Sequence, residues 1–285
     1  MAHYLTGLDH TLIGVSDLEE AKKTYEKIGF TITPRGSHIG WGTANYCIMF
    51  GEDYIELLGI VDDTRESNGL DKLLEERGEG LLGMAFASSD PEKTRSSLQE
   101  TGLAPSELLD LKRKLELPEG DVIPEFKLLR LRPEGLSERN LFICHHLTPE
   151  LIRRPEWETH ANATDHIKSV VIVVEDPKSL QDYYNRLCGV LNVTLTDSTL
   201  SVRVGRMTMI FVSDSDLDLL FPGLVIDGDF PEFPYLIAMT LAVKDFSQTE
   251  EYLSGTDLTV QKIANGALRL SPKETHGVVL EFVAS

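Results

Sequence analysis

An apolar run followed by an amphipathic segment recurs four times along the chain. In each copy a strand-like run ends at an Asp that precedes Leu, Pro or Phe, and a helix-like segment then leads to a Gly. Asp accepts hydrogen bonds from the free amides of a first helical turn, Pro fits the opening position, and Gly adopts the left-handed conformation that ends a helix. The junctions lie at Asp17, Asp90, Asp176 and Asp245. Four copies of one junction predict an internal repeat.

Further strand-like runs follow each predicted helix, and every copy closes on an apolar strand. The closing runs are Tyr54–Leu58, Leu141–His145, Met207–Val212 and Val278–Val283. The unit is therefore a strand, a helix and about three strands, which is an α+β module. A unit this small cannot easily cover the second face of its sheet alone. We therefore expect the modules to work in pairs.

Two segments interrupt the pattern. Ser106–Glu125 is charged and Leu-rich, and we expect a loop with a short helix there. Thr148–Asp165 contains prolines and polar residues but no strand alternation, which is typical of a connection between domains. We therefore divide the chain into a first two-module domain at residues 1–147, a linker at 148–164 and a second two-module domain at 165–285.

The charge balance excludes several partners. The chain carries 46 acidic and 27 basic residues, a net charge of -19, so its mean field repels phosphate backbones and anionic membrane surfaces. The short basic runs Lys112–Lys114 and Arg153–Arg154 lie among carboxylates. No secretory signal is visible, and no apolar run approaches the ~20 residues needed to span a bilayer. We expect neither a nucleic-acid nor a membrane partner.

The number and spacing of the cysteines indicate the cellular compartment of the protein. Cys47, Cys144 and Cys188 are odd in number, far apart and embedded in apolar runs. This spacing favours reduced, buried thiols over a disulfide framework or a zinc knuckle. We therefore expect a cytoplasmic protein.

One stretch of the first module concentrates polar side chains that can carry chemistry. Gly36–Asn45 is rich in Gly and holds a His and an Asn, while His10 precedes it and Glu56 follows within a strand-like apolar run. An unpaired carboxylate is costly to bury, so such a Glu tends to be a metal ligand, ion-paired or turned to the surface. The glycines could shape a turn alone, or they could let backbone amides approach a ligand closely.

These residues resemble a known superfamily. Leu8-Asp9-His10 at the first strand and Tyr54-Ile55-Glu56-Leu57 at the closing strand are similar to the vicinal oxygen chelate superfamily, which includes glyoxalase I, fosfomycin-resistance enzymes and extradiol ring-cleaving dioxygenases. The run from His38 to Asn45 resembles the His-x-Gly-x-Gly-Thr-x-Asn signature of its glyoxalase-like branch. The repeat covers most of the chain, whereas the signature covers only the first module. The resemblance implies four βαβββ modules paired into two curved, mixed or antiparallel half-barrel sheets with the helices outside.

The resemblance also implies a divalent metal, Fe, Mn, Zn or Ni, held by the first and last strands of paired modules. In module one these positions are His10 and Glu56. In module two, alignment on Asp90 places Gly83 where His10 stands, so a ligand would come from the closing strand. His145 and His146 point to opposite faces of that strand. We favour His146 as the third ligand, and His145 stays the alternative.

The remaining site residues are expected to line the concave side of the curved sheet. By resemblance, His38, Trp41, Gly42, Thr43 and Asn45 contact the substrate, and His38 or the metal-bound Glu56 moves a proton. In the second domain Ser169 and Ala238 take the place of His10. Glu281 fits the slot of Glu56, so we expect a degenerate copy.

Three functions remain open. The leading hypothesis is a metal-dependent lyase or isomerase that binds a small substrate through two adjacent oxygens. The alternatives are an extradiol-type ring-cleaving dioxygenase, since two His and one carboxylate also suit Fe(II), and a non-catalytic small-molecule binding or resistance protein. Either a monomer or a homodimer is compatible with this fold.

Overall fold

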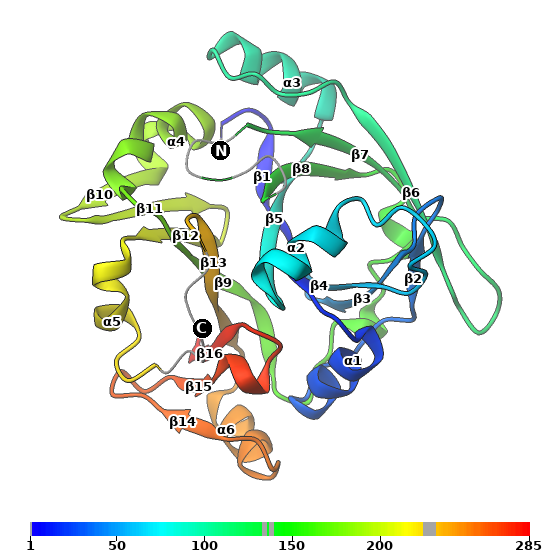
Figure 1. Cartoon of the computed structure of the whole chain (residues 1–285), viewed down its shortest axis with the longest axis vertical. Helices are drawn as coiled ribbons and strands as arrows, with labels where there is room; N and C mark the ends of the chain where they lie inside the picture. Colours follow the sequence, from blue (N-terminus) through cyan, green and yellow to red (C-terminus); the bar gives the residue numbers. More distant parts are fainter. Residues whose placement is uncertain (1, 133–135, 137–139, 225–231) are drawn as a thin grey trace.

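The computed structural model describes residues 2–132, 136, 140–224 and 232–285, and its strands form two eight-stranded sheets (Figure 1). The first sheet is a closed barrel with the order β1-β4-β3-β2-β6-β7-β8-β5. Its strands are β1 (Leu5–Gly14), β2 (Gly36–His38), β3 (Thr43–Met49), β4 (Tyr54–Ile60), β5 (Gly80–Ser88), β6 (Leu109–Leu115), β7 (Glu125–Arg130) and β8 (Leu141–His146).

The second sheet is open and has the order β10-β11-β12-β9-β13-β16-β15-β14. Its strands are β9 (Thr164–Val173), β10 (Val193–Thr196), β11 (Thr199–Val204), β12 (Met207–Val212), β13 (Tyr235–Val243), β14 (Val260–Lys262), β15 (Leu268–Leu270) and β16 (Val279–Ala284). In both sheets the first and last strands of each module pair in parallel, while the modules meet through the antiparallel pairs β1–β5 and β9–β13. The predicted fold class of paired βαβββ modules is confirmed.

The predicted junctions form helix caps. The carboxylates of Asp17, Asp90, Asp176 and Asp245 each accept a hydrogen bond from a backbone amide of the following helical turn. The helices are α1 (Leu18–Lys27), α2 (Leu70–Arg77), α3 (Pro91–Glu100), α4 (Gln181–Cys188), α5 (Leu217–Leu220) and α6 (Phe246–Ser254). Helices α1, α3, α4 and α6 lie outside the sheets (Figure 1). Within the described ranges, none is long and apolar enough to cross a bilayer.

The prediction for Ser106–Glu125 was wrong, because this segment contains the complete strand β6 and the first residue of β7. Strand β6 pairs with β2 and with β7, and the β2–β6 pairing closes the barrel. The alternation was hidden because charged residues occupy both faces of the strand: Asp110 and Lys112 are exposed, whereas Arg113 is buried. Because Arg113 is charged although it is buried, the sequence of β6 was interpreted as a loop.

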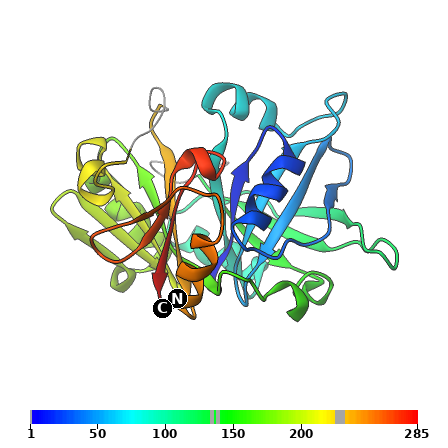
Figure 2. The ribbon, with the colours of Figure 1, turned by 90° about the horizontal axis from the view of Figure 1, so that it is seen from below.

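The two sheets lie side by side and share one apolar core (Figures 1 and 2). Across their interface the rings of Phe30 and Phe282 stack with centroids 6.3 Å apart. The buried Tyr25 hydroxyl donates to the carbonyl of Thr275 at 3.1 Å. A second cluster, which includes Met49, Trp157 and Leu115, is separate from this shared core. Cys47, Cys144 and Cys188 are buried and free.

The segment between the sheets is anchored on the first one. It forms the short 3-10 turns η1 (Pro149–Leu151) and η2 (Pro155–Trp157), and we retain residues 148–164 as the proposed linker. His160 is its main anchor, since its Nε2 lies 2.9 Å from the carbonyl oxygen of Met49 and its Nδ1 accepts from the amide of Thr31 at 3.1 Å. Burial lowers the pKa of His160 to about 4, so this imidazole is neutral at pH 7.

We expect His160 to make folding stability depend on pH. Its pKa in the folded chain is about 4, against 6.5 without perturbation, so protons favour the unfolded chain between these values. The stability contribution is complete above pH ~6.5 and is lost as the pH falls towards ~4, by about 3 kcal/mol. Urea unfolding of the wild type and of His160→Gln at pH 7 and pH 4 measures this loss as a difference between the two proteins. An identical pH dependence in both would contradict the assignment.

Candidate functional site

His10 and Glu56 meet inside the barrel because of one strand register. Strands β1 and β4 pair in parallel, with His10 opposite Tyr54 and Leu12 opposite Glu56, so both polar side chains point to the same face. The Nε2 atom of His10 lies 3.5 Å from Oε2 of Glu56. Both side chains are buried. The first module therefore brings an imidazole and a carboxylate together in the barrel interior.

The second module places no ligand at the corresponding positions. Strands β5 and β8 pair in the same parallel way, with Ala85 opposite Phe142, so Phe142 stands where Glu56 stands in module one. The position of His10 is taken by Gly83. A Cβ atom there would lie 2.6 Å from the carbonyl oxygen of Asn140, so a His at this position would force β8 away from β5.

A cavity of about 230 Å³ opens above this pair of residues. Its polar end is formed by His10, His38, Thr43, Asn45, Glu56 and Arg113. The exposed Arg130 is a further lining residue, and the walls are mainly Leu and aromatic side chains. The turn before α2 and the helix itself contribute Ser67, Asn68, Leu70 and Leu73. Glu56 is the single carboxylate among the described residues that line this cavity.

His38 also faces Glu56. Its Nδ1 lies 2.9 Å from the Thr43 hydroxyl, which leaves Nε2 directed towards the carboxylate, 4.0 Å from Oε1. Burial lowers the pKa of His38 against the opposing effect of Glu56, so the ring is neutral at pH 7. The ring of Trp41 packs beside it with centroids 5.5 Å apart. Each of the two cavity histidines thus directs its Nε2 atom at the same carboxylate.

Glu56 is held in its ionised form. Burial alone would raise the pKa of its carboxyl group, but the imidazoles of His10 and His38 and the guanidinium of Arg113 hold that pKa below its usual value. The amide of Asn45 donates a hydrogen bond of 2.5 Å to Oε1. The other oxygen, Oε2, is the one nearest to His10.

Behind His10 lies a buried carboxylate that the sequence reasoning did not assign. Asp9 Oδ2 lies 2.7 Å from Nδ1 of His10, and Asp9 Oδ1 lies 2.9 Å from Nε2 of His146. The guanidinium of Arg153 reaches Oδ1 at 3.4 Å. Although burial opposes ionisation, His146 and His10 hold the pKa of Asp9 far below its usual range. Asp9 therefore fixes the orientation of His10 from the side opposite Glu56.

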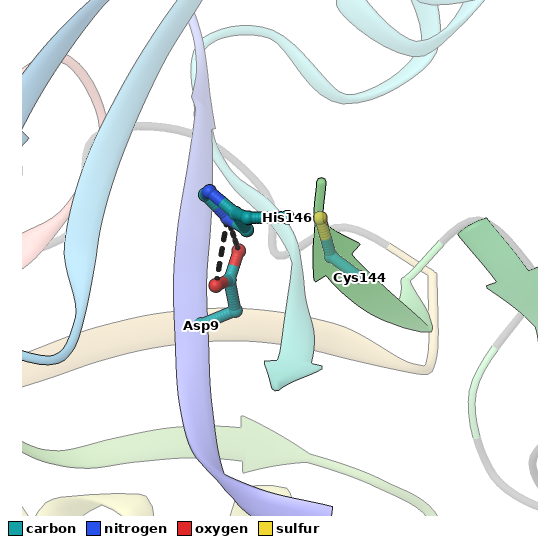
Figure 3. Close-up of side chains that lie close together, drawn as sticks. All are labelled: Asp9, Cys144 and His146. Atoms are coloured by element: carbon teal, nitrogen blue, oxygen red, sulfur yellow. Dashed lines mark hydrogen bonds and ion pairs between the residues drawn. The ribbon is translucent and has the colours of Figure 1, made fainter. Parts of the chain in front are cut away.

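Among the described residues, Asp9, Cys144 and His146 form a cluster whose side-chain atoms lie close enough together to hold a metal (Figure 3). One atom from each lies within 4.8 Å of the others. Figure 3 shows the imidazole of His146 turned towards Asp9, with the Cys144 sulfur on the neighbouring position of β8. Burial raises the pKa of the Cys144 thiol well above its usual value, so the sulfur is protonated at pH 7.

Comparison with known proteins identifies the family. A family model described as a glyoxalase-like domain matches residues 8–188, which is more than half of the chain. The chain belongs to the glyoxalase-like domain family. A search of curated proteins by sequence returned no match.

Solved structures support the fold. A hypothetical protein from Staphylococcus aureus matches this glyoxalase-like chain with a TM-score of 0.64 at 11% identity, over 98% of this chain and 99% of the other. A mutant of 4-hydroxymandelate synthase from Streptomyces coelicolor gives 0.60 at 12% identity, over 98% and 92%. A xylose isomerase-like TIM barrel/4-hydroxyphenylpyruvate dioxygenase fusion protein gives 0.59 at 9%, over 99% of this chain and 49% of that one. At these identities the three structures show a shared fold, and the family model confirms the glyoxalase-like resemblance seen in the sequence.

The structure brings together most of the site residues predicted from the sequence. Six of them line the cavity: His10, His38, Trp41, Thr43, Asn45 and Glu56. Gly42 lies outside the lining, where its amide donates to the Glu66 carbonyl at 2.8 Å and a Cβ would collide with the Asp62 carbonyl. His146 points to Asp9, and the Nδ1 of His145 lies 2.7 Å from the Ser88 carbonyl oxygen. Neither lines the cavity.

Two residues escaped the sequence reasoning. Strict alternation would turn Asp9 away from the face of His10, but a register shift between Leu8 and His10 in the β1–β5 pairing brings both side chains together. Arg113 was hidden in a short basic run. Its signal was the alternation of Leu111, Arg113 and Leu115 along one face of β6.

In the second sheet, the carboxylate equivalent to Glu56 is neutralised. Thr240 pairs with Glu281, which gives Glu281 the register of Glu56. The guanidinium of the buried Arg269 donates to Oε1 of Glu281 at 2.8 Å and lies over the ring of Phe221. An ion pair therefore takes the place of the imidazole–carboxylate pair.

Replacing Asp9 should destabilise the fold. In Asp9→Ala, His10, His146 and Arg153 lose their shared buried acceptor, which should cost about 3 kcal/mol. Urea unfolding in EDTA measures the loss without any contribution from a bound metal. Asp63→Ala, which removes an exposed carboxylate, should change the stability by less than about 0.5 kcal/mol. A similarly small effect for both variants would contradict the role of Asp9.

Proposed function

We propose that this glyoxalase-like chain is a metal-dependent enzyme of the lyase or isomerase type that binds a small substrate through two adjacent oxygens. The observation that carries the proposal is the convergence of His10 Nε2 and His38 Nε2 on the carboxylate of Glu56, at 3.5 and 4.0 Å, at the polar end of a largely apolar cavity. The free cysteines add support for the cytoplasm as its location.

The donor set fits a divalent transition metal. Both imidazoles have their Nδ1 anchored, on Asp9 and on Thr43, and this leaves Nε2 of each available to a metal. Two imidazoles and one carboxylate suit Fe, Mn, Zn or Ni and leave positions open for substrate oxygens. We therefore assign His10, His38 and Glu56 as the ligands. In this assignment His38 takes the place that the sequence reasoning gave to His146.

The Asp9, Cys144 and His146 cluster fits a metal less well. The Asp9 carboxylate already accepts from two imidazoles and from Arg153. A metal there would have to displace these donors and remove a proton from the buried Cys144 thiol. The cluster is better suited to orienting His10.

Each residue of the site would have a separate role in the reaction. When bound, the metal supplies a Lewis acid that polarises a carbonyl and stabilises a developing enediolate oxyanion. Glu56, ionised and held by Asn45, would move the proton at the adjacent carbon. The apolar walls, with α2 across the cavity, would exclude water from the reacting carbon.

Metal content tests the ligand assignment. We expect one divalent ion per chain after reconstitution. His10→Ala, His38→Gln and Glu56→Gln should each weaken metal binding by more than roughly 10- to 100-fold, which is the effect of replacing a residue that only hydrogen-bonds to a metal ligand. Elemental analysis and competition with a chelator measure this. Glu281→Gln is the matched control, since it changes the equivalent position in the second sheet, and it should keep the ion.

His146→Gln separates the two ligand sets. It should retain the ion with at most a roughly tenfold loss of affinity, because His146 acts through Asp9. Loss of the ion in His146→Gln together with its retention in His38→Gln would instead make His146 the third ligand and His38 the proton carrier.

Proton exchange tests the reaction class. In D₂O the manganese-loaded protein should exchange the C–H proton of small 2-hydroxyketones, detected by NMR, since an enediolate forms and collapses on the same carbon. Glu56→Gln should slow exchange by roughly 100-fold or more. Exchange no faster than with the metal-free protein would contradict a lyase or isomerase.

The donor set also favours one alternative, an extradiol-type dioxygenase. Two His and one carboxylate are the ligands of many Fe(II) oxygenases, and one structural neighbour contains a 4-hydroxyphenylpyruvate dioxygenase. Oxygen uptake with catechols by the Fe(II)-loaded protein, without proton exchange, would favour this alternative. Ligand binding that survives EDTA, with neither activity, would indicate a non-catalytic binding protein.

A further inference from the structure

Arg113 is a buried cation in the wall of the cavity. Only 4% of it is exposed. It lies on β6 directly opposite His38 on β2, and its side chain lines the cavity. The guanidinium therefore belongs to the same polar end as the proposed metal ligands.

The protein compensates this charge in part, through the electrostatic effect of the Glu56 carboxylate and through weak polar contacts. One guanidinium nitrogen, Nη1, donates to the sulfur of Cys47 at 3.3 Å, and the guanidinium lies 5.5 Å from the ring centroid of Phe126. Its Nε is buried and has no hydrogen-bond partner, and Arg113 forms no ion pair among the residues that the structure describes. Burial raises the pKa of the Cys47 thiol, so Cys47 is a neutral and weak acceptor.

Arg269 shows how the second sheet accommodates a buried Arg. Only 1% of Arg269 is exposed, yet its Nε donates to Oε1 of Glu281 at 2.8 Å, and its Nη2 lies 2.8 Å from the same oxygen in an ion pair. A guanidinium stays charged at any accessible pH, and leaving it buried without an anion is costly. Arg113 has the burial of Arg269 without its carboxylate.

We propose that Arg113 binds the carboxylate of the substrate, which is a small carboxylic acid whose apolar chain lies against Leu111, Leu128 and Phe142. These side chains line the same cavity as Arg113, and Leu111 lies two residues before it on β6. A guanidinium matches a carboxylate through two parallel hydrogen bonds. A singly charged group fits better than a phosphate, since the ionised Glu56 shares the cavity and would repel a second negative charge. The inference rests on the proposed function in taking the cavity as the substrate site.

Two isosteric probes test the inference. Isothermal titration of the full chain with 3-phenylpropanoate and with 3-phenylpropanamide compares an anion with a neutral amide of the same shape. The wild type should bind the acid roughly tenfold or more tighter than the amide, both in EDTA and when loaded with manganese. Arg113→Met should abolish that preference. Arg113→Lys should keep part of the preference for the acid, because the positive charge remains but the two parallel N–H donors of the guanidinium are lost.

Lys114→Met is the matched control. It removes the same charge from the neighbouring residue of β6, whose ammonium pairs with Asp121 outside the cavity lining, and it should leave the preference unchanged. Equal binding of the two probes by the wild type, or no binding of the acid at millimolar concentration, would overturn the inference even if Arg113→Met fails to fold. An acid preference without any metal binding would contradict the proposed function and leave this inference standing.

Discussion

The parallel pairing of β1 with β4 is the constraint on which the site depends. It places His10 and Glu56 on one face of adjacent strands, two residues apart in register. On its other edge β1 pairs with β5, and the register shift there turns Asp9 towards His10. One strand thus supplies an imidazole and the carboxylate that orients it. Closure of the barrel between β2 and β6 then brings His38 and Arg113 to the same cavity.

The repeat could be predicted from the sequence because its signals are local. Asp caps, terminal glycines and apolar strands act over a few residues, and the motifs of the first module predict that His10, His38 and Glu56 belong to one site. The partners of Asp9 and the burial of Arg113 could not be predicted. Both depend on how distant strands pair: a register shift for Asp9, and the pairing of β6 with β2 for Arg113. Alternation alone also could not show that His146 would turn to Asp9.

The two halves share one fold but differ in how their buried charged side chains are paired. In the first, Glu56 faces two imidazoles, and Arg113 stays without an ion pair among the described residues. In the second, the equivalent Glu281 pairs directly with Arg269, and Phe221 lies against the guanidinium. A carboxylate and a cation that satisfy each other leave little for a ligand to bind. In the first half, Glu56 and Arg113 form no ion pair with each other, so both charges can interact with a ligand in the cavity.

We propose that a metal binds at the cavity end of His10 rather than at its Asp9 end. Anomalous diffraction from manganese-soaked crystals tests this directly, since it locates the ion without assumptions about activity. We expect a single peak within coordination distance, roughly 2.0–2.3 Å, of His10 Nε2, His38 Nε2 and a Glu56 oxygen. A peak among Asp9, Cys144 and His146, with none beside Glu56, would contradict this proposal.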